Sequence, residues 1–469
     1  MADRMASMLQ RTRETLTLVL LVLLPFHALF VTVGTRVLEG PGNAPLAMLA
    51  LWKETLLALA LLIAFIEWLK SSDRWRFDLL DGLLIAFAAL ALAVSLLLHT
   101  ELRMLALGIK YDLVPLGVFF LLRRVPWSEK FLPRALAALF VVGGVVAGYG
   151  VLTLFLPQGF FSFLGYSDLH SLYLPDGSLA AFQRIEGLPL KRIQSTLSGP
   201  NQLGLWLLIP WAAGVTGLLT TFCSSPLNGG ILRRRKRCWM QGCLLVLLAL
   251  ALLFSFSRSA WIAAGVITIV ALYDLLPREA FRRALTRIAG LAVVAALLLA
   301  FLAPSLITRA TSTRGHLTRP LAAFKVMAQH PLGLGLGSAG PASNRVSDAC
   351  VFLEEGADAL WAADRPNLCV FVGSQQVQPT DRACSCPLLP ENWYLQVGVE
   401  LGVAGFLLFL AIVFLLLRCL RSYEDGGELF LMFLGLAVAA LFLHAWEESA
   451  VAYSVWLLAA VCCPPQKNA

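Results

Sequence analysis

Charged residues are scarce in this sequence. They make up 14% of the 469 residues, whereas hydrophobic residues make up 58%. A typical soluble domain carries about 25% charged residues. A soluble protein this apolar could not cover its surface with polar groups, so the excess must face lipid. The composition therefore excludes an ordinary soluble domain and predicts a membrane protein.

The net charge of +8 does not indicate a nucleic-acid-binding protein, because the basic residues are grouped in short segments between apolar runs. Such grouping fixes the orientation of membrane proteins, with the basic loops in the cytoplasm. The densest group is the run of five basic residues at 233–237. We interpret it as an orientation signal, with contact to anionic membrane lipids as the alternative.

Membrane-spanning helices need about 20 apolar residues each, and about twelve segments meet this requirement. They lie near residues 15–35, 46–66, 79–98, 104–122, 134–156, 197–222, 239–256, 259–276, 286–306, 391–417, 428–444 and 449–463. The sequence thus predicts an all-α polytopic membrane protein. The basic N-terminal segment lacks a small-residue cleavage site, so we expect the first helix to stay uncleaved.

Two longer interruptions divide the chain. Residues 1–306 hold the first nine predicted helices with a shorter loop at 157–196, residues 307–390 form a large loop, and residues 391–469 hold the last three helices. If the N-terminus is cytoplasmic, every inside loop is basic and the short outside loops are poor in basic residues. Both termini are then cytoplasmic, and both long loops are extracytoplasmic.

Four of the ten cysteines fall in the large loop, where an oxidising environment preserves disulfides. They are Cys350, Cys369, Cys384 and Cys386. Cys384 and Cys386 are too close to pair comfortably with each other, so we expect each to pair upstream, with a zinc site as the alternative. We expect residues 375–390 to be irregular and 318–329 to form a helix lying over the membrane.

The other six cysteines fall in predicted helices or on the reducing side of the membrane. They are Cys223, Cys238, Cys243, Cys419, Cys462 and Cys463. We expect no disulfide among them.

Four ionisable residues interrupt predicted spans near the outer surface: Lys53, Glu54, Lys110 and Asp112. Each costs at least about 2.5–3.5 kcal/mol at the bilayer centre, so function is the first hypothesis for such residues. We interpret them as the lining of a polar cavity open to the outer leaflet. Internal ion pairs are the alternative.

A polar stripe opens the tenth predicted span. Asn392, Gln396 and Glu400 are four residues apart and share one helical face. We expect this face to look into the cavity, with hydrogen bonds between helices as the alternative.

Two predicted helices begin on the outer side with features suited to an anion. One opens at Pro200 and Asn201, and the other at Arg258. Proline suits the first turn of a helix, and the free N–H groups and dipole of a helix start attract negative charge. The nearby basic residues are Arg184, Lys191 and Arg192. Arginine with helix N–H groups suits a diphosphate, with capping or lipid headgroup binding as the alternative.

The segment 330–337 alternates glycine with leucine after His330 and Pro331. It lacks the strand, turn and helix of a dinucleotide site, so we expect its glycines to form tight turns over the cavity. His330 would cap the preceding helix or contact substrate.

Together these segments resemble the bacterial O-antigen ligase and polymerase family over residues 180–420. The resemblance is carried, in order, by Arg192 with 198–201, by 256–261, by 330–337, and by 391–396 with Glu400 and Gly402. It implies a GT-C-like architecture of about twelve helices in the bacterial inner membrane. It also implies a polyprenyl-diphosphate-linked glycan donor, a glycan or lipid acceptor, and no metal or other cofactor.

Under this resemblance, Arg192 and Arg258, helped by Arg184 and Lys191, would stabilise the leaving diphosphate during inverting glycosyl transfer. The ligases typically carry histidine where this chain has Glu391, but a carboxylate can also accept a proton. Glu391 would therefore act as base or orient the acceptor, and Arg314 and His330 are secondary candidates. Ligase and polymerase both remain open.

The alternative class is a transporter or flippase of lipid-linked or anionic solutes. Transporters tend to contain repeated halves and helices broken near the midplane. This sequence has no such duplication, which favours the enzyme.

Overall fold

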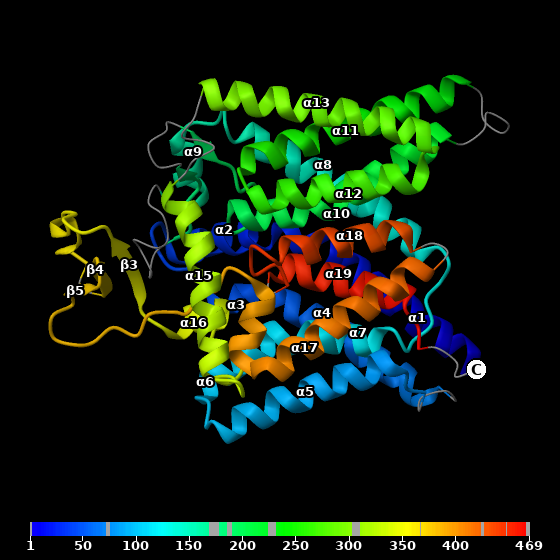
Figure 1. Ribbon diagram of the computed structural model, residues 1–469. Coiled ribbons are helices and arrows are strands. Elements are labelled where there is room, and N and C mark those ends of the chain that lie inside the picture. The colour runs from blue at the N-terminus through cyan, green and yellow to red at the C-terminus, as the bar shows by residue number, and fades with distance from the viewer. Residues whose placement is uncertain are drawn as a thin grey trace.

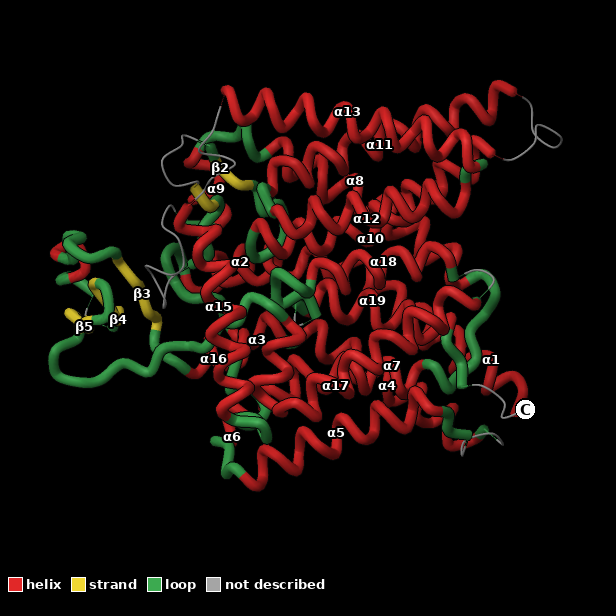
Figure 2. Tube along the Cα trace, in the orientation of Figure 1, coloured by secondary structure: helices red, strands yellow, loops and turns green. Residues whose placement is uncertain are grey.

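The computed structural model describes residues 2–71, 76–167, 178–184, 190–223, 231–302, 310–365, 367–423, 426–446 and 448–465. Most of these residues belong to helices that lie side by side in one bundle, with two small sheets at one of its ends (Figures 1 and 2). The fold is thus that of a mainly helical membrane protein.

The helices of the first half are α1 (Ala2–Leu23), α2 (His27–Glu39), α3 (Ala47–Ala50), α4 (Trp52–Lys70), α5 (Leu79–Leu97), α6 (Leu102–Gly108), α7 (Val114–Leu122), α8 (Phe131–Leu152) and α9 (Gln158–Leu164). A 3-10 turn, η1 (Leu24–Phe26), joins α1 to α2, and a π-helical segment, η2 (Ile109–Leu113), joins α6 to α7.

The second half contains strands β1 (Gln183–Arg184), β2 (Lys191–Arg192), β3 (Ala349–Leu353), β4 (Leu368–Val372) and β5 (Gln375–Gln378), with the 3-10 turn η4 (Leu360–Ala362). Its helices are α10 (Pro200–Cys223), α11 (Ile231–Ser255), α12 (Arg258–Leu275), α13 (Arg278–Leu302), α15 (Ala310–Gln329), α16 (Gly340–Val346), α17 (Trp393–Ser422), α18 (Gly427–Ala439) and α19 (Ser449–Cys462).

Long apolar segments become helices because hydrocarbon offers no partner for backbone N–H and C=O groups. Polar caps complete their exposed ends. In α5, the Asp78 carboxylate accepts from Asp81 N at 2.9 Å while the Asp81 carboxylate accepts from Asp78 N at 3.1 Å. In α17, the Asn392 side chain accepts from Leu395 N at 2.9 Å.

Nine helical stretches in the described ranges are long and apolar enough to cross a membrane. They correspond to the first eight predicted spans and the tenth. A polytopic membrane protein is therefore confirmed, but twelve spans are not. The helices at the last two predicted spans, α18 and α19, have 13 and 14 residues. The predicted span 286–306 begins within α13, and its last residues lie outside the described part.

Both long loops lie at the same end of the bundle. Figure 1 shows α9, α15, α16 and strands β3–β5 at this end, which we call the loop end, whereas the first turns of α1 lie at the opposite end. Helix α15 crosses the ends of the bundle at a steep angle to the long helices. It contains the helix predicted at 318–329 and begins earlier, at Ala310.

The large loop carries a three-stranded sheet with the strand order β3-β4-β5, in which β4 pairs parallel to β3 and antiparallel to β5. Its small core contains Val351, Ala362, Leu368 and Val370. Strand β5 corrects the expectation that residues 375–390 are irregular throughout, because this polar segment pairs with the apolar β4.

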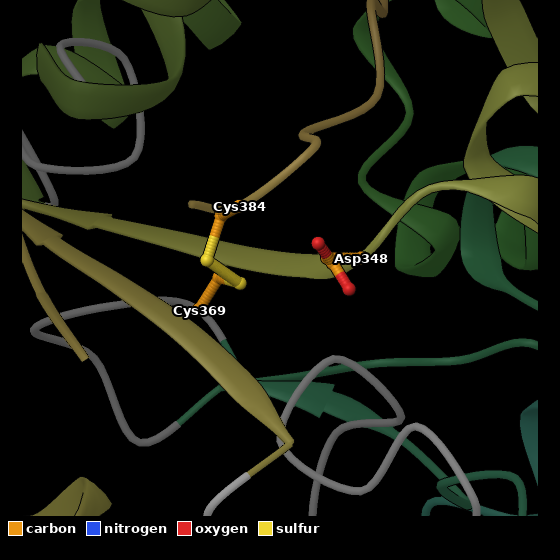
Figure 3. A group of neighbouring side chains, drawn as sticks. All are labelled: Asp348, Cys369 and Cys384. Carbon is orange, nitrogen blue, oxygen red and sulfur yellow. A yellow bond between two sulfur atoms is a disulfide. The ribbon is translucent and has the colours of Figure 1, made fainter. Parts of the chain in front are cut away.

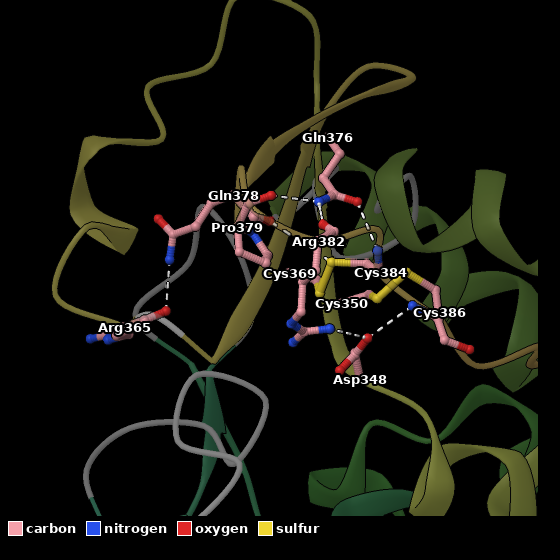
Figure 4. Close-up of a disulfide and its surroundings, with 11 residues drawn as sticks. Asp348, Cys350, Arg365, Cys369, Gln376, Gln378, Pro379, Arg382, Cys384 and Cys386 are labelled. Carbon is pink, nitrogen blue, oxygen red and sulfur yellow. Dashed lines mark hydrogen bonds and ion pairs between the residues drawn. A yellow bond between two sulfur atoms is a disulfide. The ribbon is translucent and has the colours of Figure 1, made fainter.

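Two disulfides staple this sheet to the returning chain. Cys350 is bonded to Cys386 and Cys369 to Cys384, as Figure 4 shows. The prediction that Cys384 and Cys386 each pair upstream is confirmed.

The zinc alternative does not fit these bonds. The ligand atoms of Asp348, Cys369 and Cys384 lie within 4.8 Å of one another (Figure 3), but the two sulfurs are bonded and offer no thiolate. The Asp348 carboxylate instead accepts from the Arg382 guanidinium and from Ser385 N, each at 2.8 Å. These bonds hold the pKa of Asp348 below its usual value.

A third disulfide was not expected from the sequence. Cys419, near the end of α17, is bonded to Cys463, just after α19. The expectation of no disulfide outside the large loop is therefore wrong for this pair. The packing of the two helices brings together cysteines that are 44 residues apart.

The Asp348 contacts predict how acid affects the sheet of the large loop. Because the pKa of Asp348 is lowered in the folded state, its carboxylate contributes stability above the unfolded pKa of about 3.9. This stabilisation is lost as the pH falls through the folded pKa. Asp348→Asn should remove roughly 1 kcal/mol near neutral pH and speed amide hydrogen exchange in β3 and β4. Asp364→Asn, at an exposed position, is the control. Unchanged exchange in Asp348→Asn would contradict the assignment.

Candidate active site

Arg192 joins three segments at the loop end. Its Nε donates to Ser255 O at 3.0 Å, its Nη1 to Gln183 Oε1 at 3.1 Å, and its Nη2 to Asn201 Oδ1 at 2.7 Å. Gln183 and Arg192 also face each other across the β1–β2 pair. The guanidinium is thereby fixed between β1, the end of α11 and the first turn of α10.

The two predicted helix starts are confirmed and lie side by side. Helix α10 begins at Pro200 and α12 at Arg258. A Cβ added to Gly204 would lie 2.8 Å from Ala260 Cβ and 2.9 Å from Ser257 Cβ, so the first turns of α10 and α12 are in close contact. Their positive dipole ends therefore reinforce each other beside the Arg192 guanidinium.

Left-handed backbone marks the segments of the candidate site. Ser195, Phe256 and Glu391 have φ values of 54°, 49° and 52°. This conformation costs a non-glycine residue roughly 1–3 kcal/mol and is concentrated at functional sites. Among the described non-glycine residues only His99, with φ 51°, shares it. The strain lies just after β2, just before α12 and just before α17.

The remaining basic candidates are only partly placed. Lys191 Nζ lies 4.8 Å from the centre of the Phe182 ring, and the Lys191 backbone pairs with Arg184. The side chains of Arg184 and Arg314 lie outside the described part of the structure. The structure thus brings together Arg192, Asn201 and the helix start at Arg258.

The polar stripe of α17 makes hydrogen bonds to neighbouring segments of the chain, and its expected place in a cavity stays a prediction. Besides capping α17, Asn392 donates from Nδ2 to Leu441 O at 2.9 Å. Gln396 is fully buried, and its Oε1 lies 2.5 Å from His444 Nδ1. Hydrogen bonding within the bundle, the alternative interpretation, accounts for both residues.

Glu400, the third residue of the stripe, binds the glycine segment. Its side chain accepts from Ala339 N at 3.3 Å, and its backbone carbonyl accepts from Gly335 N at 2.9 Å. Gly333, Gly335 and Gly337 have φ values of 89°, 96° and 81°, so the predicted tight turns are confirmed. They pack against α17 and α6. From the sequence we expect them to cover a cavity.

His330 directly follows α15 and has an exposed side chain. Its backbone N–H donates to Val326 O at 2.8 Å, and its carbonyl accepts from Gly333 N at 2.8 Å. Neither bond involves the imidazole, so the choice between cap and substrate contact stays a prediction.

Three of the four polar residues of the second and fourth spans form internal ion pairs, which supports the alternative interpretation, and the cavity stays a prediction. Glu54 Oε1 lies 3.2 Å from Lys53 Nζ and 3.0 Å from Lys110 Nζ. Lys110 and the buried Asp112 lie in the π-helical segment η2, a rare helix type that is frequently found at functional sites.

Glu391 meets two residues that the sequence did not single out. Its Oε2 lies 2.7 Å from His316 Nδ1, and Arg319 Nη1 forms an ion pair with its Oε1. Both partners come from α15. Burial favours the protonated form of Glu391, but the His316 hydrogen bond and the Arg319 charge outweigh it and hold the pKa of this carboxyl below its usual value.

The sequence contains a pattern that could have indicated these two partners of Glu391. His316 and Arg319 are three residues apart and share one face of a helix. That face cannot be connected with Glu391 from the sequence, because the pairing depends on how α15 crosses the bundle.

Compared with known proteins, the chain matches no family model, and no curated protein is significantly similar to it. The site is therefore interpreted from its own residues.

The close approach of α17 to the glycine segment predicts a sensitive position. Gly402 has φ 68°, and a Cβ there would lie 2.0 Å from Pro331 O. Gly402→Ala should cost about 2 kcal/mol or more and lower the apparent melting temperature in detergent, followed by tryptophan fluorescence. Gly82→Ala, where a Cβ meets nothing within 4 Å, is the control. Equal melting temperatures for the two variants would show that the contact is not rigid.

Proposed function

We propose that this protein is a membrane glycosyltransferase of the O-antigen ligase or polymerase type. It transfers a polyprenyl-diphosphate-linked glycan to an acceptor hydroxyl at the extracytoplasmic face of the bacterial inner membrane. The observation that carries the proposal is the fixed Arg192 guanidinium beside the adjoining starts of α10 and α12.

A diphosphate fits this arrangement chemically. Arginine presents its donors in a planar fork that matches phosphate oxygens, and helix N-termini add N–H groups and positive potential. The neutral oxygens of Gln183, Asn201 and Ser255 hold the fork in one orientation. A fixed cation costs little reorganisation as negative charge develops on the leaving group.

The reaction is a single displacement with inversion. The acceptor oxygen attacks the anomeric carbon, and the bond from this carbon to the diphosphate oxygen breaks. The electron pair of that bond leaves with the diphosphate, which Arg192 and Arg258 stabilise with help from Arg184 and Lys191. Glu391 acts as base or orients the acceptor. Arg314 and His330 are secondary candidates on the acceptor side.

The position of the site agrees with a lipid-linked donor. Arg192, the starts of α10 and α12, and Glu391 all belong to the loop end, and the basic segments of the sequence favour the opposite end as cytoplasmic. The polyprenyl chain would then lie in the outer leaflet against the apolar bundle. We extend the nine long helices to the twelve of a GT-C-like architecture by including α13, α18 and α19.

The large loop supplies the acceptor side in this proposal. Helix α15 crosses the loop end, and the disulfide-stapled sheet projects beyond it (Figure 1). The loop then ends at Glu391, the residue proposed to act on the acceptor. The length and chemistry of the acceptor decide between ligase and polymerase.

Replacing the arginines tests the proposal. In purified protein reconstituted with a polyprenyl-diphosphate-linked oligosaccharide and candidate acceptors, Arg192→Ala and Arg258→Ala should each lower transfer by at least about 100-fold, because the leaving group loses its cation. Transfer is followed by the change in size of a labelled glycan. A longer glycan on the lipid means polymerase, and glycan on another molecule means ligase.

Arg103→Ala is the matched control, since Arg103 is an exposed arginine of α6 at the same end of the bundle. Arg192→Lys should recover only part of the rate, because lysine keeps the charge and loses the fork. Normal transfer by both alanine variants would reject the site. Movement of the lipid across the bilayer without bond formation would favour the transporter.

A further inference from the structure

We propose that His316 is the group that takes the proton from the acceptor hydroxyl, and that Glu391 is the residue that positions it. This inference rests on the proposed glycosyl transfer and changes the part that Glu391 plays in it. It is based on the contact between α15, a helix of the large loop, and Glu391, the residue at the end of this loop.

The hydrogen bond fixes the form of the imidazole. His316 Nδ1 lies 2.7 Å from Glu391 Oε2, so in the neutral ring Nδ1–H donates to the carboxylate. The lone pair is then on Nε2, which can accept a proton. The His316 side chain is 33% exposed, so a substrate can approach it from the loop end. A carboxylate that orients histidine in this way also stabilises the imidazolium that forms.

Glu391 itself is poorly suited to accept the proton. Its Oε1 is engaged by Arg319 and its Oε2 by His316. These contacts hold the pKa of the carboxyl below its usual value, whereas an efficient general base has a pKa near the working pH. A carboxylate held ionised by two partners is better suited to orient and stabilise a neighbouring cation.

The surrounding structure fixes both partners. Glu391 precedes the Asn392 cap of α17 and has a left-handed φ of 52°, a strained conformation that must be maintained by its neighbours. On the other side, α15 packs tightly on α17, since a Cβ at Gly398 would lie 2.4 Å from Met327 Sδ. The His316–Glu391 distance is therefore set by two packed helices.

Two other titratable groups face this pair. Arg319 lies beside Glu391 on α15, and His444 contributes from the segment between α18 and α19. His444 Nδ1 contacts Gln396, and its Nε2 is buried without a hydrogen-bond partner in the described structure. A buried Nε2 cannot meet an acceptor that arrives from the loop end, so His316 is the histidine placed for proton transfer.

The step balances without any further reactant. As the acceptor oxygen forms its bond to the anomeric carbon, the hydroxyl proton moves to His316 Nε2. The imidazolium is stabilised by Glu391 and later releases the proton to solvent. The bond to the leaving oxygen breaks, and its electron pair goes to the diphosphate.

The test distinguishes a general base from a residue that only holds the structure in place. His316→Asn keeps an N–H donor near the position of Nδ1, so the link to Glu391 survives while the base is lost. With the full-length protein in liposomes and polyprenyl-diphosphate oligosaccharide as donor, His316→Asn should lower transfer by about 100-fold to 10,000-fold. Its affinity for glycan-free polyprenyl diphosphate should stay within about twofold, because the diphosphate binds elsewhere.

Glu391→Gln should also lower transfer strongly, because an amide can turn its N–H₂ toward the ring and favour the wrong tautomer. The wild-type rate should fall on the acid side of its pH profile as the base is protonated, and this limb should vanish from the residual activity of His316→Asn. Lys325→Ala, at an exposed position on the same helix, is the control and should transfer normally.

Transfer by His316→Asn at nearly the wild-type rate, with Arg258→Ala inactive, would overturn the role of His316 and leave glycosyl transfer standing. Wild-type protein that binds polyprenyl diphosphate but transfers no glycan to any acceptor would overturn both proposals. An acid limb that persists in His316→Asn would assign the proton to another group and overturn the inference.

Discussion

The carboxylate of Glu391 links the large loop to the helix bundle through ionic hydrogen bonds. His316 and Arg319 of α15 both bind this carboxylate. Glu391 also immediately precedes the capped start of α17. Charge-assisted hydrogen bonds of this kind are among the strongest polar contacts in proteins. The positions of α15, of the strained Glu391 backbone and of the start of α17 therefore depend on this one carboxylate. The geometry of the loop end depends on it as well.

Two buried ion-pair groups within the helix bundle have a different character. Arg123 is buried and binds Asp78 at 2.5 Å and Asp81 at 2.7 Å, and Arg13 binds Glu67 at 2.6 Å. Removing either partner of such a buried pair would leave a charge without compensation, which costs several kcal/mol. These pairs connect helices to one another and to the segment that follows α7.

The groups at the loop end are held in place but remain reachable. Arg192 is fixed by neutral oxygens from three segments, and His316 is partly exposed beside an ionised carboxylate. Preorganised charge of this type acts on a substrate without first having to rearrange. We therefore propose that the starts of α10 and α12 stabilise the leaving group, and that proton transfer takes place between α15 and α17.

Features governed by local chemistry were predicted from the sequence. The starts of α10 and α12 follow from Pro200 and from the polar residues around Arg258, and apolar length predicted all nine stretches that the described structure shows to be long enough to span, together with three that it does not confirm. That Cys384 and Cys386 each pair upstream followed from the compartment and from their short spacing, whereas the partner that each one takes is known only from the structure.

Features that depend on tertiary packing were not predicted. Whether Lys53, Glu54 and Lys110 line a cavity or neutralise one another depends on how α4 and η2 meet. The Cys419–Cys463 bond depends on the packing of α17 and α19. The contact of Glu391 with His316 joins residues from opposite ends of the large loop, and no local pattern specifies it.

A cryo-electron microscopy structure of the protein in lipid nanodiscs with bound polyprenyl diphosphate would test the central claim most directly. We predict both phosphates between β2 and the starts of α10 and α12, within hydrogen-bond distance of Arg192. Phosphate density at Lys53 and Lys110 instead, with the Arg192 segment empty, would contradict it.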